Sequence, residues 1–220
     1  MPRDASITHT RILDAAHALI LQRGFAGTSV DDILGGAGIS RGTFFYHFPT
    51  KDDMARELLA RHAADDIAMT DSFMERAERL ARDPLEQLLV FLGLYLEMLA
   101  DAEDPARGCL FASFSYEAGL FDEETTSLIE RAVDHWRDRV GGKIQEAMDR
   151  HPLRVDTDAG TLADLGYTVF EGALIMARVR KDQTLLARHL QEYRKYLELA
   201  FGIADQVAAG RTGQGAATSD

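Results

Sequence analysis

The sequence predicts an all-α protein with an N-terminal three-helix domain, followed by a larger bundle of longer helices. Apolar residues recur at helical spacing through most of the 220 residues, and the alternating apolar and polar runs typical of strands are absent. Turn signals are widely spaced, which leaves segments long enough for helices. The composition, 46% hydrophobic and 27% charged, is that of an ordinary globular protein.

The first two predicted helices are bounded by clear signals. Apolar positions predict a helix over 7–24 that stops at the glycine there. Thr28 and Asp31 form a weak capping box for a second, short helix. The GGAG stretch at 35–38 ends it.

The third predicted helix covers only RGTFFYHF at 41–48, between Ser40 as N-cap and Pro49. On a helical wheel Phe44 and Phe48 lie one turn apart and define its buried side. The outward side then carries a glycine, a hydroxyl, a phenol and an imidazole, for which packing gives no reason. These outward residues are Gly42, Thr43, Tyr46 and His47.

Longer helices are expected in the rest of the chain. Their predicted ranges are 50–79, 84–100, 107–118, 122–150, 156–180 and 184–207. The pair Gly141-Gly142 predicts a bend in one of them. The small, polar residues 208–220 predict a disordered tail. The predicted domains are therefore 1–50, 51–207 and this tail.

Charge is distributed unevenly along the chain. The net charge is −12, yet residues 1–62 contain seven Lys/Arg and seven Asp/Glu, so the acid excess lies after residue 62. An acidic body would repel DNA, whereas a neutral head could still approach it.

Several features predict a cytoplasmic protein without a membrane partner. The opening MPRDASITHT is too polar for a signal peptide, and the most apolar run, 88–100, is too short to cross a bilayer. The single cysteine, Cys109, excludes an internal disulfide and fits a reducing compartment.

Patterns typical of enzymes are missing. The seven histidines show no metal-ligand spacing, and neither a Gly-rich phosphate loop nor a G-x-S-x-G elbow occurs. We therefore expect no catalytic activity, no metal and no cofactor.

Two short helices joined by a glycine-containing turn, with a polar and aromatic outer face on the second, are typical of a helix-turn-helix that reads the major groove of DNA. Thr28, Ser29 and Lys51 would then lie at the rim, where phosphates run. In the alternative interpretation, this segment is a capped helical hairpin within a larger core. Arg41 would then be a solvated surface residue and Tyr46 a partly packed one.

The stretch TRILDAAHALILQRGFAGTSVDDILGGAGISRGTFFYHFPTKDDM resembles the DNA-binding domain of TetR/AcrR-type transcriptional regulators, from about residue 8 to 58. The resemblance implies that Arg41, Thr43 and Tyr46 face bases and that Thr28, His47 and Lys51 face phosphates. The chain departs from the family at Phe45, where a tyrosine hydroxyl often contacts a phosphate. The full predicted DNA-binding set is Thr28, Ser29, Ser40, Arg41, Gly42, Thr43, Phe45, Tyr46, His47 and Lys51.

The resemblance also implies a bundle with a small-molecule pocket and a homodimer interface in its last two helices. EGALIMARVRKD at 171–182 looks like part of the first of these two helices. The predicted pocket residues are Phe91, Tyr95, Cys109, Phe111, Phe114, Trp136 and Phe170. The predicted interface residues are Gly166, Phe170, Ala173, Leu174, Ala177, Tyr193 and Leu197. The small-residue stripe among them can equally serve packing within one chain.

Cys109 has two readings. RGCLFASFSYEAG at 107–119 resembles a subgroup with a Gly-Cys pair in the pocket-forming part, and a thiol in the first turn of a helix has its thiolate favoured by the helix dipole. This favours a sensor of electrophiles or oxidants. In the other reading, Cys109 is a small buried apolar residue.

The sequence thus predicts a ligand-responsive, DNA-binding regulator. We expect a repressor that a small molecule in the C-terminal bundle releases from a palindromic operator. The alternative is a helical small-molecule-binding protein or enzyme whose N-terminal helices only pack.

Overall fold

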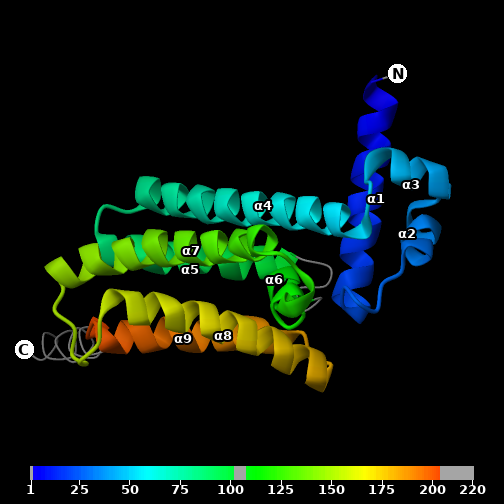
Figure 1. The fold of residues 1–220 in the computed structure, drawn as a ribbon. Helices are drawn as coiled ribbons and strands as arrows, with labels where there is room; N and C mark the ends of the chain where they lie inside the picture. The colour runs from blue at the N-terminus through cyan, green and yellow to red at the C-terminus, as the bar shows by residue number, and fades with distance from the viewer. Residues whose placement is uncertain (1, 102–107, 204–220) are drawn as a thin grey trace, which may run out of the picture. The chain divides into compact units, whose positions relative to one another are not determined.

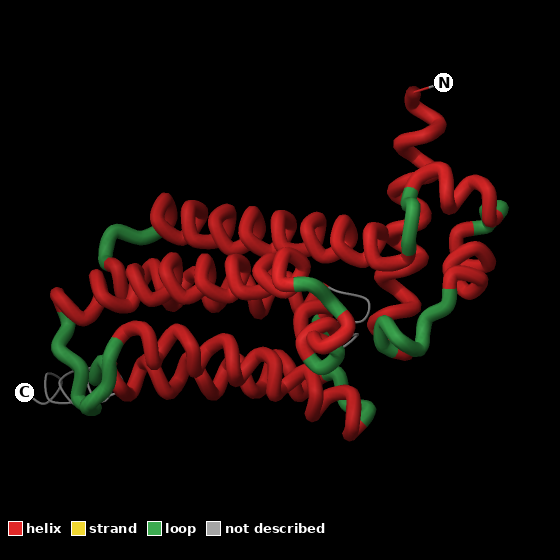
Figure 2. The backbone as a smooth tube through the Cα atoms, in the orientation of Figure 1, coloured by secondary structure: helices red, strands yellow, loops and turns green. Residues whose placement is uncertain are grey.

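The computed structural model describes residues 2–101 and 108–203, and the elements within these ranges are helices (Figures 1 and 2). The elements are α1 (Pro2–Arg23), α2 (Val30–Ala37), α3 (Arg41–His47), α4 (Lys51–Leu80), α5 (Pro84–Asp101), α6 (Leu110–Ser115), the 3-10 helix η1 (Ala118–Leu120), α7 (Glu123–Arg150), α8 (Ala159–Arg180) and α9 (Thr184–Ala200). The predicted all-α class is confirmed.

The start of α2 differs from the prediction by one residue. Ser29 is the N-cap: its hydroxyl accepts the N–H of Asp32 (3.1 Å), and the Asp32 carboxylate accepts the N–H of Ser29 (2.9 Å). The Thr28 hydroxyl donates instead to the carbonyl oxygen of Gly24 (2.8 Å), and Thr28 is fully buried. The capping box is therefore Ser29 with Asp32, and the prediction of Thr28 with Asp31 was wrong.

Helix α7 runs unbroken through the two glycines at which we predicted a bend. Gly141 is buried, and a Cβ there would lie 3.7 Å from both the Ala159 carbonyl oxygen and the Ala163 Cβ. The absent side chain thus lets the backbone of α8 come close to α7, which is a packing role.

The chain divides into two compact units. Unit 1 comprises Met1–Met69 and Ala106–His135, and unit 2 comprises Thr70–Pro105 and Trp136–Asp220. Two of their boundaries, after Met69 and after His135, fall within α4 and α7. The boundary at residue 50 stays a prediction. The predicted tail at 208–220 lies outside the described residues.

Unit 1 contains a core built on α1. Phe44 and Phe48, the predicted inner side of α3, are 0% and 1% exposed, as expected from their spacing. The same core takes in α6, which packs on α1. Its largest side chains include Ile12, Ile20, Phe25, Ile33, Phe44, Phe48, Leu58, Phe111 and Phe114.

In unit 2, α8 and α9 lie side by side and are joined by the short turn 181–183 (Figure 1). The pair is tightly packed: a Cβ at Gly166 would lie 3.0 Å from the Tyr193 ring, whose hydroxyl donates to the carbonyl oxygen of Leu162 (2.7 Å). Because only hydrogen fits at Gly166, the two helix axes come close together.

A charged network lies within unit 2. The Lys143 side chain is 4% exposed, and its Nζ donates to Gln87 Oε1 (2.8 Å), Glu146 Oε2 (2.7 Å) and Glu78 Oε1 (3.0 Å). Arg139 donates both terminal nitrogens to the Glu78 carboxylate (3.0 and 3.1 Å). The hydrogen bonds from Arg139, and to a smaller extent that from Lys143, lower the pKa of Glu78 below its usual range.

Candidate nucleic-acid interface

Helix α3 is a seven-residue helix fixed at both ends. The Ser40 hydroxyl accepts the N–H of Thr43 (3.2 Å), and the N–H of Phe48 donates to the carbonyl oxygen of Phe44 (2.9 Å). With Phe44 and Phe48 buried, the opposite face is left to solvent. Tyr46 is 79% exposed and Phe45 is 45% exposed.

The turn between α2 and α3 depends on a glycine. Gly38 has φ +63°, in the left-handed region, and its N–H donates to the carbonyl oxygen of Gly35 (3.3 Å). Arg11 of α1 donates to the carbonyl oxygen of Ala37 at the same turn. The direction in which α3 leaves α2 is therefore set from α1 as well as from the turn itself.

The predicted phosphate-facing residues differ in their availability. The Lys51 Nζ donates to the carbonyl oxygen of Phe25 (2.6 Å) and lies 3.8 Å from the centroid of the Phe25 ring. Burial lowers the pKa of Lys51 below its usual range, although Asp52 and Glu117 act in the opposite direction. Thr28 has no exposed surface, so its prediction as a phosphate contact was wrong.

The remaining predicted contact residues lie on or beside α3. Arg41 donates to Asp31 Oδ1 of α2 (2.5 Å), and both side chains are exposed. His47 is half-buried and contacts the ring of Tyr46 edge-on. The caps Ser29 and Ser40 are exposed, as is Gly42, and Thr43 is half-buried.

The predicted ligand-pocket aromatics fall into two separate packed groups. Phe91, Tyr95 and Trp136 lie in unit 2 with ring centroids 5.1–5.7 Å apart. Phe111 and Phe114 belong to the core of unit 1. The two groups belong to different units, and one pocket lined by all of these residues stays a prediction. Phe170 is half-buried on α8.

Cys109 is the N-cap of α6, one residue before the first turn in which we expected it. Its Sγ lies 3.5 Å from the N–H of Ala112, and the residue is half-buried. The sensing hypothesis stays a prediction.

The predicted dimer stripe is for the most part internal to the chain. Gly166, Leu174, Ala177 and Leu197 are buried in the packing of unit 2, so their assignment to a surface for a second copy was wrong. The apolar residues of α8 do recur at helical spacing, but they pack against other helices of the same chain. Ala173 and Tyr193 of the predicted interface are also buried, at 1% and 4% exposure.

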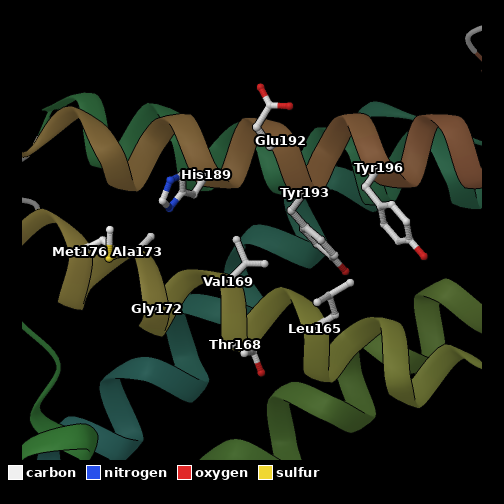
Figure 3. Close-up of a pocket in the computed structure, with 10 residues that line it drawn as sticks. All are labelled: Leu165, Thr168, Val169, Gly172, Ala173, Met176, His189, Glu192, Tyr193 and Tyr196. Atoms are coloured by element: carbon white, nitrogen blue, oxygen red, sulfur yellow. The ribbon is translucent and has the colours of Figure 1, made fainter.

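A groove of about 500 Å³ runs between α8 and α9, lined mainly by apolar groups. Figure 3 shows Val169 and Leu165 of α8 extending toward α9, and Tyr193 of α9 extending toward α8. Apolar side chains on this pair also remain exposed. They include Leu165, Ile175, Met176, Val179, Tyr196 and Leu199.

Two partly buried titratable groups in unit 1, His62 and Asp66, were not singled out from the sequence. Burial, with a smaller effect of His17, lowers the pKa of His62 to about 4. Burial raises the pKa of Asp66 to about 6, against the opposing charge of His135. His62 is therefore neutral at pH 7, and it packs edge-on against Phe111 at 4.7 Å.

The described residues contain neither a membrane-spanning helix nor a cluster of metal ligands. None of the described helices has both the length and the apolar character needed to cross a bilayer. Within the same ranges, no three His, Cys, Asp or Glu side chains come together as a metal site would require.

A capped helix-turn-helix whose second helix presents an exposed tyrosine, joined to a helical bundle, defines a DNA-binding regulator. Models of known families match both parts of the chain. Residues 12–58 match the bacterial regulatory proteins of the tetR family, and residues 84–193 match the Tetracyclin repressor-like C-terminal domain. The chain belongs to the TetR family of transcriptional regulators.

Individual relatives agree with this assignment. The chain is 26% identical to the transcriptional regulator AcuR of Cereibacter sphaeroides over 177 residues, which cover 80% of this chain and 78% of AcuR. It is 30% identical over 181 residues to the uncharacterized HTH-type transcriptional regulator Rv0196 of Mycobacterium tuberculosis, covering 80% and 87%. A TetR-family regulator from Agrobacterium tumefaciens shares the fold, with a TM-score of 0.72, 21% identity, and coverage of 87% and 98%. The family assignment favours the regulator over the alternative of a small-molecule-binding protein or enzyme.

Proposed function

We propose that the chain represses transcription as a homodimer on a palindromic operator, and that a small molecule bound in the C-terminal helices releases it. The observation that carries this proposal is the outer face of α3. Tyr46 is 79% exposed on a short helix whose Phe44 and Phe48 are buried. A face with this chemistry has no packing role, and it suits base edges in the major groove.

In this proposal Arg41, Thr43 and Tyr46 meet bases. Ser29, His47 and Lys51 lie toward the phosphates. Lys51 exchanges its bond to the Phe25 carbonyl oxygen for a phosphate oxygen, which replaces a neutral acceptor with a charged one. Arg41 likewise gives up its ion pair with Asp31 when it contacts DNA. An exposed ion pair of this kind contributes little, so the exchange costs little.

Dimerisation follows from the size of the reading head. One helix-turn-helix contacts a short half-site, and pairing two heads is the usual route to adequate affinity. The groove between α8 and α9 supports this part of the proposal, since a second copy would cover its exposed apolar side chains. A coupling of about 1–3 kcal/mol between effector and operator binding would suffice for release.

Replacing Tyr46 with alanine is expected to weaken operator binding by about 1–3 kcal/mol and to leave binding to random DNA nearly unchanged. The side chain is mostly solvated, so folding stability should change by less than about 0.5 kcal/mol. The probe is a duplex that the wild type selects from a random-sequence library, and the measurement is a fluorescence-anisotropy titration.

Tyr116→Ala is the matched control, because Tyr116 is also 79% exposed and belongs to the same unit. It should bind like the wild type. A folded Tyr46→Ala protein with wild-type affinity for the selected duplex would contradict base reading by α3.

Gly42→Ala should separate folding from binding. A Cβ at Gly42 would meet only the Ser40 hydroxyl oxygen, at 3.9 Å, so the head should gain up to about 1 kcal/mol of stability. Operator affinity should nevertheless fall, since the methyl group would prevent close approach of the DNA. Thermal unfolding and the same titration measure the two effects. Gly35→Ala on α2, where a Cβ would meet nothing within 4 Å, should gain stability without losing affinity. Full affinity in Gly42→Ala would show that this glycine is dispensable for contact.

A further inference from the structure

The turn between α1 and α2, residues 24–28, is held by a carboxylate from a distant part of unit 1. Glu117 lies between α6 and η1, and its two oxygens accept the backbone N–H groups of Phe25 (2.8 Å) and Ala26 (2.7 Å). Both are bonds to a charged acceptor, which are stronger than bonds between neutral groups. One side chain thus satisfies two consecutive donors of the turn.

Further groups hold the same turn. Thr28 donates from its hydroxyl to the carbonyl oxygen of Gly24, and in the DNA-free chain Lys51, at the start of α4, also donates to the carbonyl oxygen of Phe25. Phe25 is 5% exposed, and the centroid of its ring lies 4.7 Å from that of Phe121, the residue that follows η1 in the sequence. The turn is therefore fixed through its backbone and through its one large side chain.

The local sequence leaves room for the carboxylate. Gly24 has φ +78°, in the left-handed region, and a Cβ there would overlap Glu117 Oε1. Glycine at this position serves both the backbone conformation and the approach of Glu117.

The turn leads directly into the DNA-reading segment. Ser29 caps α2 immediately after it, and α2 passes through the Gly38 turn into α3. With eight and seven residues, these helices are too short to be stable alone, so their direction depends on what holds their ends. Glu117 holds the first end, and Arg11 holds the junction between α2 and α3.

We propose that Glu117 is a positioning residue for DNA binding: its carboxylate fixes the turn at 24–28 in the arrangement from which α3 reaches the major groove. The inference rests on the proposed contact of α3 with DNA. Glu117 touches no base or phosphate in this proposal.

Glu117→Gln tests the inference. The glutamine oxygen can accept one of the two N–H groups, whereas its amide nitrogen is itself a donor. The dissociation constant for the selected duplex should rise about tenfold, the size expected for one lost bond to a charged group. Amide hydrogen exchange at Phe25 and Ala26 should become faster, while the fraction of active protein in a stoichiometric titration should stay at the wild-type level.

Glu130→Gln is the control for charge, because Glu130 is an exposed glutamate on α7 in the same unit. Loss of a negative charge alone strengthens binding to a polyanion, which is opposite in sign to the expected effect at Glu117. Gly24→Ala is a second variant that displaces the carboxylate without changing the charge, and it should weaken binding in the same way as Glu117→Gln.

Equal affinities of Glu117→Gln and Glu130→Gln would overturn the inference. It would also be overturned if the active fraction of Glu117→Gln fell while the remaining protein kept its wild-type dissociation constant, since that result means a purely structural role. Tyr46→Ala in the same assay separates the two proposals. A loss with Tyr46→Ala and none with Glu117→Gln refutes the role of Glu117 alone, whereas no loss with Tyr46→Ala refutes DNA reading by α3.

Discussion

Replacing Gly172 with arginine is expected to give a monomer that binds the operator about 10²–10⁴-fold more weakly than the wild type, because avidity between two linked heads is lost. Gly172 lines the groove between α8 and α9 (Figure 3), and a Cβ there would meet nothing within 4 Å. The Cβ of a new side chain therefore meets no clash in the folded chain, and the helix gains propensity. A guanidinium buried between two apolar faces would, however, be desolvated without a partner.

Light scattering measures the mass of the Gly172→Arg protein, and circular dichroism measures its helix content. Fluorescence anisotropy measures its affinity for the operator. Gly142→Arg is the matched control, because Gly142 is an exposed glycine within α7 of the same unit, where a Cβ would again meet nothing within 4 Å. It should remain a dimer with full affinity. A Gly172→Arg protein that stays dimeric at wild-type mass would place the interface elsewhere on the chain.

Lys143→Ala is expected to destabilise the protein by about 3 kcal/mol, the low end for breaking a buried ion pair. The ammonium is buried, whereas Glu78 and Glu146 are partly exposed and can regain water. The amide oxygen of buried Gln87 loses its partner and has less access to water. Urea unfolding followed by circular dichroism measures the difference.

Lys195→Ala serves as the control, since Lys195 forms an exposed pair with Glu192 (2.7 Å) on α9 and its loss should cost less than about 1 kcal/mol. The pH dependence gives a second check. The lowered pKa of Glu78 means that its bonds stabilise the fold above the usual glutamate range, and that this contribution is lost as the pH falls through the folded-state pKa. The stability that the protein loses on acidification should be smaller in Lys143→Ala than in the wild type. If Lys143→Ala and Lys195→Ala lowered the free energy of unfolding equally, the buried network would contribute no more to stability than a surface ion pair.

The helices could be predicted from the sequence because their signals are local. Gly24, the glycines near 38 and Pro49 mark the ends of the first three, and the spacing of Phe44 and Phe48 gave the buried side of α3 correctly. The capping box could not be resolved in this way. Thr28 with Asp31 and Ser29 with Asp32 are overlapping versions of one pattern, and a contact of Thr28 with the end of α1 decides between them.

The sequence could not show which helix or which other molecule covers each buried face. The stripe on α8 predicted burial, but periodicity does not say whether another molecule or α9 covers it. The aromatic residues of α5 and α6 were predicted to line one pocket, and no local feature of the sequence assigns the two helices to different units. Glu117 carried no signal at all, because its two bonds reach residues 92 and 91 positions away.

Trp136 is the only tryptophan of the chain and lies in unit 2. Its indole N–H donates to the carbonyl oxygen of Ala163 (3.2 Å), and its ring packs against Phe91, Tyr95 and Tyr167. Selective excitation of its fluorescence therefore reports on this unit without interference from the DNA-reading one. An aromatic effector entering the unit would quench or shift that emission directly, so a library of candidate inducers can be screened on the unlabelled wild-type protein before its operator is known.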